Sequence, residues 1–456
     1  MCHEFVALCP AAPRLPGSHL QGITRGCSGY KRSKLRECGL SSLGLTPQIR
    51  MACGAVVHAG RTCPREFGAL KAHTLGVTMP TAYTTTRGPS FASLRPAGEP
   101  VDAGIDFPVY DKLVDRLAQP SDTPDDAVRH VLATCCGYAY GDQDVVAMML
   151  ARMGLESANL AEITMSVDAM LLRSTAYIVQ SNDGRVVILC YRGTPPLDLI
   201  SWALDAEIEP EQVDIGRAGD PLRGDVHGGF YRNVRATRAD VVKVLLRAVD
   251  AKSIIRGGGG VVKPLEALYI TGHSLGGAMA LLMAMMLRKT QPGTDYGKIA
   301  DKLRAVYTFG QPMVASGQLA DDLQQDRFFR DNLVRYIYNR DVIPQLPPMG
   351  DYAHFGQEYQ YDVNAGCWSR SERLTGQLTD RQAWLDVVST LTSLWRPTRA
   401  VALFEGRVGI TERVHDHYPE RYVAAAAPSG KTEFDAQRQY KIQGIRSGAD
   451  GQKREH

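Results

Sequence analysis

The sequence lacks several features that would mark common classes of protein. No uninterrupted apolar run approaches the ~20 residues that a membrane-spanning helix needs, so we expect no transmembrane segment. The 10 cysteines include no pair at CxxC spacing, which argues against a zinc or redox site of that type. The first residues lack a continuous apolar stretch, so a secretory signal is not expected. The glycine run 257–260 is not followed by Gly-Lys-Ser/Thr, which excludes a phosphate-binding loop of that class.

The chain also lacks a large excess of charge of one sign, because its 52 basic and 49 acidic residues nearly balance. The net charge is only +3, and residues 1–78 contribute ten basic and three acidic residues, so the remainder is slightly acidic. We therefore expect no nucleic-acid partner. Adjacent Cys135 and Cys136, and Cys190 within an apolar run, are interpreted as buried thiols of a reducing compartment. These observations favour a cytoplasmic protein.

The chain divides into a head, a long body and a tail. Residues 1–78 show no sustained periodicity and are rich in Gly, Pro, Arg and Cys, which predicts a disordered head. A translation start at Met51 or Met79 and an organellar targeting segment are the alternatives for this head. Periodic structure predicts one domain over residues 105–427, and residues 428–456 have the mixed polar composition of a loose tail.

Within the body, apolar strands alternate with amphipathic helices. Residues 174–194 predict a β-hairpin with an Asn-Asp-Gly turn. Residues 107–118 have helical spacing, and Thr123 followed by Pro124 predicts the N-cap and first position of the next helix. Further strands are predicted over 266–270, 304–309 and 332–338, and further helices over 235–249 and 275–289. This order predicts an α/β fold with a mostly parallel central sheet and helices on both faces.

The stretch "TGHSLGGAM" (271–279) stands between a predicted strand and a long apolar helix. A serine on such a sharp turn is exposed as a nucleophile, and side chains two positions away would collide with the adjoining strand and helix. Gly272 and Gly276 remove those side chains, which predicts Ser274 as a nucleophile, and Gly277 favours close helix packing. A purely structural turn serine is the alternative.

A serine nucleophile needs donors for the oxyanion that forms on its substrate. The backbone N–H of Leu275 opens the following helix and supplies one donor. The buried strand ending in "RGT" supplies Thr194, whose N–H and hydroxyl are both donors. By itself "RGT" would indicate only a turn. It indicates an oxyanion donor because it occurs together with the serine turn.

Six motifs occur together in the chain in a defined order. They are "YRGT" (191–194), "VHGGFY" (226–231), "GHSLGGAMA" (272–280), "TFGQP" (308–312), "NRDVIPQLPP" (339–348) and "YAHFGQE" (352–358). Their order resembles that of the class 3 lipases. The resemblance covers roughly residues 125–425. It implies an α/β-hydrolase fold, acylglycerol substrates, a Ser-Asp-His triad and an oxyanion donor at Thr194. Tyr191, where Phe is more usual, and a long segment between acid and histidine depart from the family.

The triad order of this fold is serine, acid, histidine, and the acid follows a strand. Asp341 follows the predicted strand 332–338, and the family motif also selects it. Other aspartates lie in charged stretches that favour solvated surface: Asp321, Asp322, Asp326 and Asp331. His354, His415 and His417 are the candidate bases. The family's Asp-His, Pro, Tyr pattern selects His417, with Pro419 opening a helix, and leaves structural roles to His130, His227 and His273.

Two segments are candidate covers of the site. Residues 195–212 follow the oxyanion strand and contain Trp202 as an apolar anchor. Residues 367–400 include a stretch with one strongly apolar face that carries Trp384 and Trp395. A cover of this kind would allow transient contact with a lipid–water interface. The alternative is that the second segment packs on the sheet.

These expectations converge on a serine carboxylester hydrolase of the lipase type that cleaves acylglycerols or related lipid esters. It would use an acyl-enzyme intermediate and no metal or organic cofactor. Phospholipase A1, monoacylglycerol lipase, short-chain esterase and acyltransferase activities are alternatives that use the same site. A non-catalytic lipid-binding scaffold is the alternative outside enzymes, although such a scaffold usually lacks a triad member.

Overall fold

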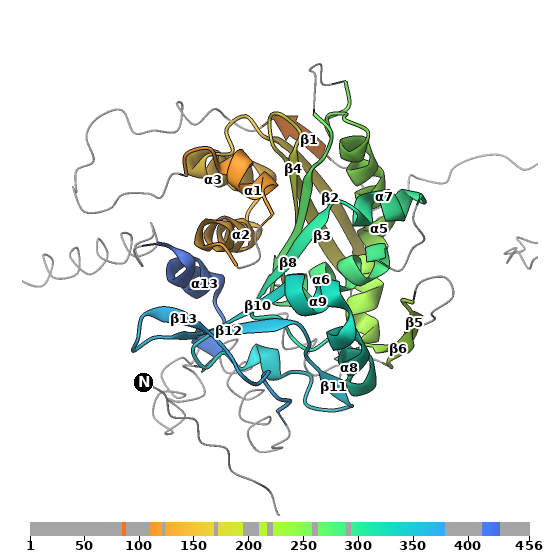
Figure 1. Cartoon of the computed structure of the whole chain (residues 1–456), viewed down its shortest axis with the longest axis vertical. Coiled ribbons are helices and arrows are strands. Elements are labelled where there is room, and N and C mark those ends of the chain that lie inside the picture. Colours follow the sequence, from red (N-terminus) through yellow and green to blue (C-terminus); the bar gives the residue numbers. More distant parts are fainter. Residues whose placement is uncertain are drawn as a thin grey trace, which may run out of the picture. The chain divides into compact units, whose positions relative to one another are not determined.

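The computed structural model describes residues 84–87, 110–120, 124–167, 172–194, 209–216, 222–257, 263–288, 293–378 and 413–428 (Figure 1). All of them belong to one unit, residues 73–456. The predicted head, and the predicted tail beyond its first residue, lie outside the described residues. Within the described ranges, no helix has both the length and the apolar character that a membrane crossing requires.

A nine-stranded sheet forms the centre of the described part, in the order β1-β2-β3-β4-β7-β8-β10-β12-β13. Its strands are β1 (Thr84–Arg87), β2 (Asn159–Val167), β3 (Leu172–Gln180), β4 (Val186–Tyr191), β7 (Ala267–His273), β8 (Leu303–Phe309), β10 (Leu333–Tyr338), β12 (Gln357–Asp362) and β13 (Cys367–Arg370). From β4 to β12 the neighbouring strands are parallel, while the flanking strands pair antiparallel. The predicted hairpin is the antiparallel pair β3–β4.

Helices cover both faces of this sheet (Figure 1). One face carries α1 (Leu113–Ala118), α2 (Asp126–Tyr138), α3 (Gln143–Met153) and α13 (Pro419–Ala426). The other carries α5 (Gly228–Val249), α6 (Leu275–Arg288), α7 (Asp295–Ala300), α8 (Gly317–Gln325) and α9 (Arg327–Asn332). Side chains of β4 alternate between the two cores, because successive strand residues point to opposite faces. The α/β fold class predicted from the sequence is confirmed.

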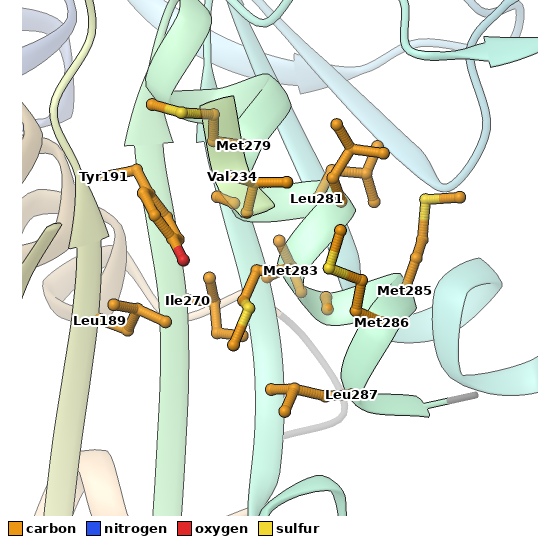
Figure 2. Close-up of a cluster of buried hydrophobic side chains, with 14 of the residues drawn as sticks. Leu189, Tyr191, Val234, Ile270, Met279, Leu281, Met283, Met285, Met286 and Leu287 are labelled. Atoms are coloured by element: carbon orange, nitrogen blue, oxygen red, sulfur yellow. The ribbon is translucent and has the colours of Figure 1, made fainter. Parts of the chain in front are cut away.

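Helix α6 lies at the centre of the larger core (Figure 2). Every residue from Leu275 to Leu287 is buried, and its methionines belong to the same apolar cluster as Leu189 and Ile270 of the sheet. A helix that is apolar all round is stable only where protein surrounds it. The start of α6, at the serine turn, is therefore held by packing along the whole helix.

The structure corrects the predicted start of α2. Asp125 is its N-cap, and the side chain accepts a hydrogen bond from the N–H of Val128 at 2.9 Å. Thr123, predicted as the cap, lies outside the described residues, and Pro124 precedes the helix. The prediction failed because the sequence holds two residues that can cap a helix, Thr123 and Asp125. The one that forms the cap is Asp125, whose carboxylate stands three residues before the free N–H of Val128.

Some elements had no clear sequence signal. Strand β2 was not predicted, and neither was a second, four-stranded sheet in the order β11-β9-β6-β5. Its strands are β5 (Glu211–Asp214), β6 (Arg223–Val226), β9 (Ala315–Ser316) and β11 (Tyr352–Ala353). The short strands of this sheet, two to four residues each, are too short for an alternating pattern to develop.

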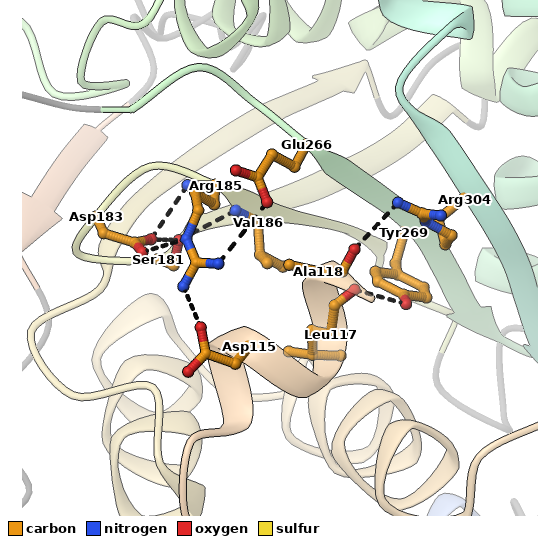
Figure 3. Close-up of polar contacts among 10 residues, drawn as sticks. All are labelled: Asp115, Leu117, Ala118, Ser181, Asp183, Arg185, Val186, Glu266, Tyr269 and Arg304. Carbon is orange, nitrogen blue, oxygen red and sulfur yellow. Dashed lines mark hydrogen bonds and ion pairs between the residues drawn. The ribbon is translucent and has the colours of Figure 1, made fainter. Parts of the chain in front are cut away.

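Arg185, at the β3–β4 turn, joins three parts of the fold (Figure 3). Its guanidinium pairs with Asp183 at 2.6 Å and with Asp115 of α1 at 2.5 Å. Glu266, just before β7, lies 3.7 Å away. These charge-assisted bonds raise the pKa of Arg185 and fix α1 against the edge of the sheet opposite the serine turn.

The thiols predicted to be buried are buried. Cys135, Cys136 and Cys190 are free and enclosed between α2 and the sheet. Cys136 Sγ lies 3.1 Å from Thr271 Oγ1 and 3.9 Å from Cys190 Sγ. Burial raises the pKa of Cys190, so the thiol form is favoured there.

Candidate active site

Ser274 stands on the turn between β7 and α6, as the sequence predicted. Its φ of 58° lies in the left-handed region, which an L-residue other than Gly, Asn or Asp seldom adopts. The backbone is held there by a hydrogen bond from the Ser274 N–H to the Phe309 carbonyl of β8, at 2.9 Å. The side chain is fully buried, where the sequence predicted an exposed one, and among the described residues its Oγ has no hydrogen-bond partner. Strain of this kind is characteristic of functional turns.

The two glycines around Ser274 are required by sterics. A Cβ on Gly272 would lie 2.2 Å from the backbone of Gly276, and a Cβ on Gly276 would lie 2.2 Å from the Tyr191 carbonyl. Both contacts are far shorter than real Cβ contacts. The close approach allows the end of β4, which continues into Thr194, to lie against the start of α6.

Asp341 lies three residues after β10, at the carboxyl edge of the parallel strands. It is 2% exposed, and its Oδ1 accepts from the N–H of Ile343 at 2.9 Å. The alternative aspartates lie elsewhere: Asp321 and Asp322 on α8, Asp326 as the N-cap of α9, and Asp331 paired with Arg330 at an exposed position.

His417 lies against this carboxylate. Its Nδ1 is 2.7 Å from Asp341 Oδ2, and because a carboxylate only accepts, Nδ1 carries the hydrogen. In the neutral ring Nε2 is then the lone-pair nitrogen, and within the part of the chain that the structure describes it has no hydrogen-bond partner. His415 is exposed on the surface, and the predicted helix begins at Pro419. The structure thus brings Asp341 and His417 together and leaves His415 apart.

The remaining histidines have structural surroundings. His354 is buried and donates from Nε2 to the Pro344 carbonyl at 2.7 Å. His130 on α2 bonds through Nδ1 to Tyr110 at 2.9 Å. His227 stacks on Phe230 with ring centroids 3.9 Å apart, and burial lowers its pKa to about 4.

Thr194 and Leu275 lie at the same edge of the sheet as Ser274. The parallel register pairs Tyr191 of β4 with Gly272 of β7, so the segments that follow these two strands begin at the same level of the sheet. Thr194 is 9% exposed. Leu275 is the first residue of α6, where the backbone N–H groups have no intrahelical partner. Thr194 and the first N–H of α6 therefore follow neighbouring strands at the edge of the sheet that carries Ser274.

Three further residues shape the site, and the sequence analysis gave none of them a role of its own. Tyr422 of α13 donates its hydroxyl to Asp341 Oδ2 at 2.5 Å and accepts from the Tyr338 N–H at 3.1 Å. Gly310 has a φ of 60°, and a Cβ there would lie 2.8 Å from Asp341 Oδ2. Asp416 accepts from Asn339 Nδ2 at 2.9 Å, and burial raises its pKa. The family motifs around these positions were the available signal.

The candidate cover segments are described only in part. Trp202, Trp384 and Trp395 lie outside the described residues. Within 195–212, the final residues begin β5. Within 367–400, the first residues form β13 and a loop whose Leu378 N–H bonds to the Gln345 carbonyl at 2.9 Å. Since β13 pairs with β12, the start of the second segment belongs to the sheet.

The known proteins that are similar to this chain are lipases. Residues 188–350 match the family model described as Lipase (class 3). Triacylglycerol lipase OBL1 of Ricinus communis is 25% identical over 264 residues, which are 50% of this chain and 48% of that protein. A lipase of Rhizomucor miehei is 25% identical over 199 residues, 43% of this chain and 47% of the relative. The chain thus spans about half the length of these two curated relatives.

Solved structures with similarity to the chain include lipase II from Rhizopus niveus, with a TM-score of 0.39 and 21% identity over 52% of this chain and 80% of that one. The matched residues 188–350 contain the serine turn, Thr194 and Asp341. Over residues 188–350 the chain is therefore similar to the class 3 lipases.

Proposed function

We propose that this protein is a serine carboxylester hydrolase that cleaves acylglycerols or related lipid esters. The observation that carries the proposal is the hydrogen bonding of two buried atoms, His417 Nε2 and Ser274 Oγ. Asp341 accepts a hydrogen bond from the Nδ1–H of His417, and among the described residues both His417 Nε2 and Ser274 Oγ have no partner at this edge of the sheet. A buried polar atom without a partner is costly, so such a pair is expected where it serves a reaction.

The proposed reaction begins with proton transfer. His417 Nε2 takes the Ser274 hydroxyl proton while Oγ attacks the ester carbonyl carbon. Asp341 holds the Nδ1–H tautomer and stabilises the imidazolium that forms. The oxyanion of the tetrahedral intermediate accepts hydrogen bonds from the Leu275 N–H and from Thr194, donors that are each typically worth ~10²–10³ in rate.

Collapse of the intermediate breaks the bond to the leaving alcohol, which takes the proton from His417. The acyl group remains on Ser274 as an ester. Water then attacks this ester with His417 again as the base, and the acid is released. The names of the relatives, a triacylglycerol lipase and secreted mono- and diacylglycerol lipases, support acylglycerols as the substrate class.

The test is hydrolysis of p-nitrophenyl esters from acetate to palmitate, with and without lipid vesicles. We compare the wild type with Ser274→Ala and with Ser316→Ala, a serine at the N-cap of α8 that makes no side-chain cap bond. We expect Ser274→Ala alone to lose activity, and the wild-type rate to rise with chain length and with vesicles.

Two other outcomes have defined meanings. Ser274-dependent activity that is confined to short esters and indifferent to vesicles would replace the lipase with a soluble esterase. Equal inertness of the wild type and Ser274→Ala over the whole series would refute the enzymatic proposal and favour a lipid-binding scaffold.

A further inference from the structure

His273, the residue before the nucleophile, makes hydrogen bonds with both of its ring nitrogens. Nε2 lies 2.8 Å from the backbone carbonyl oxygen of His417, and Nδ1 lies 2.8 Å from the hydroxyl of Tyr140. A carbonyl oxygen only accepts, so Nε2 carries the hydrogen. In the neutral ring Nδ1 then accepts, and Tyr140 is the donor. The chain of bonds runs in one direction, from Tyr140 through His273 to the backbone of His417.

The protonation states in this chain are fixed by burial. Burial lowers the pKa of His273 well below its ordinary value, and the nearby His417 ring lowers it further. Burial also raises the pKa of Tyr140 above its ordinary value. These shifts favour a neutral His273 and a protonated Tyr140 at neutral pH. The direction of donation does not change when His417 takes up a proton.

The same hydroxyl also touches the oxyanion loop. A Cβ on Gly193 would lie 2.1 Å from Tyr140 Oη and 2.6 Å from the His273 carbonyl oxygen. Gly193 immediately precedes Thr194. Tyr140, just past the end of α2, thus contacts the backbone beside the oxyanion donor, and through His273 it reaches the backbone of the base.

His417 depends on such anchoring because of its place in the chain. It lies on a turn in which its own N–H bonds to the Val414 carbonyl at 3.1 Å, ahead of α13. Its ring is 4.6 Å from the His273 ring, centroid to centroid. Among the described residues Nε2 has no hydrogen-bond partner, so Asp341 holds the ring through Nδ1, and His273 adds a bond to the backbone carbonyl.

We propose that Tyr140 and His273 are positioning residues that fix the base His417 and the oxyanion loop relative to Ser274. This role rests on the proposed function. Neither residue takes part in bond making. Their loss displaces the base and the oxyanion donor from the reacting atoms, and displacements of about 1 Å in an active site cost on the order of 100-fold in rate.

The chain offers a matched control. Tyr110 bonds to Nδ1 of His130 at 2.9 Å, and the rings meet edge to face at 6.0 Å, against 5.9 Å for Tyr140 and His273. His130 lies on α2 while His273 ends β7, and the Tyr110 pair is not part of the site. Tyr110→Phe and Tyr140→Phe each remove one hydroxyl from one tyrosine–histidine bond, so their effects on folding should be similar.

The experiment measures kcat and KM on a soluble p-nitrophenyl ester, with a melting curve for each variant. We expect Tyr140→Phe to lower kcat roughly 10- to 100-fold with KM within about twofold, while Tyr110→Phe keeps the wild-type kcat. His273→Leu should lower kcat at least as far. His273→Gln keeps an amide donor near the Nε2 position and should recover part of that loss.

The outcomes separate the two proposals. Equal kcat in Tyr140→Phe and Tyr110→Phe, in an active and folded protein, would overturn the positioning role alone. Equal kcat in His273→Gln and His273→Leu would overturn the part assigned to the bond with His417. A wild type without Ser274-dependent hydrolysis would overturn the proposed function, and the positioning role with it.

Discussion

Gly310 offers a direct test of how tightly the acid and base are packed. It follows β8 with a φ of 60°, and its N–H bonds to the Tyr336 carbonyl at 2.9 Å. The added methyl group in Gly310→Ala would lie 2.8 Å from Asp341 Oδ2 and 3.0 Å from His417 Nδ1. Those two atoms are the partners of the hydrogen bond that orients the base.

The effect has two parts that a control variant separates. A left-handed φ costs an alanine roughly 1–2 kcal/mol, and Gly257→Ala has the same penalty because Gly257 has a φ of 76° with nothing within 4 Å of its Cβ position. In Gly310→Ala the carboxylate must also retreat from 2.8 Å to at least the 3.4 Å of ordinary contact. A shift of that size in the acid–base pair is expected to lower kcat roughly 10- to 100-fold.

The assay combines chemical unfolding with kcat on a short p-nitrophenyl ester. Both variants should lose roughly 1–2 kcal/mol of unfolding free energy, and Gly310→Ala should lose more than Gly257→Ala. Only Gly310→Ala should lose activity in the folded state. If the two variants had the same kcat, the contact between Gly310 and the Asp341–His417 pair would not constrain the site, and the reasoning would be refuted.

Two further predictions follow from buried hydroxyl and imidazole groups. Tyr422→Phe removes the donor to Asp341 and the acceptor of the Tyr338 N–H. We therefore expect the unfolding free energy in urea to fall by about 1–3 kcal/mol and kcat to fall as well. Wild-type values of both quantities would contradict the assigned contacts. Burial lowers the pKa of His130 to about 4 from an ordinary 6.5. Between those pH values the unfolded chain binds a proton that the folded chain does not, so the unfolding free energy should fall by up to about 3 kcal/mol as pH drops from 6.5 to 4. Urea unfolding across this window should show a smaller slope in His130→Gln, and an unchanged slope would count against the assignment.

The nucleophile turn could be predicted from the sequence because its requirements are local. Ser274 needs glycines at fixed offsets, a strand before it and a helix after it, and all of these lie within about twenty residues. The collisions expected at Gly272 and Gly276 are the ones the structure contains. The hairpin β3–β4 was equally accessible, since its turn and both strands are contiguous.

Other parts depend on contacts between distant segments and had no local signal. Tyr422 reaches Asp341 across 81 residues, and Tyr140 reaches His273 across 133. Nothing in the neighbourhood of Tyr140 distinguishes it from a core aromatic residue, and only the family pattern around His417 draws attention to Tyr422. Similarly, the choice of His417 over His415 depended on family resemblance, because two histidines two positions apart on one turn differ only in which the fold buries.

The most direct test of the account is covalent labelling of the folded full-length protein with a fluorophosphonate, followed by peptide mass spectrometry. The account predicts one phosphonyl adduct, located on Ser274 and absent from Ser274→Ala, because the nucleophile must be activated by His417 and Asp341 to react. Labelling that persisted in Ser274→Ala, or a folded wild type that did not label at all, would contradict the assignment of Ser274 as the nucleophile of a serine hydrolase.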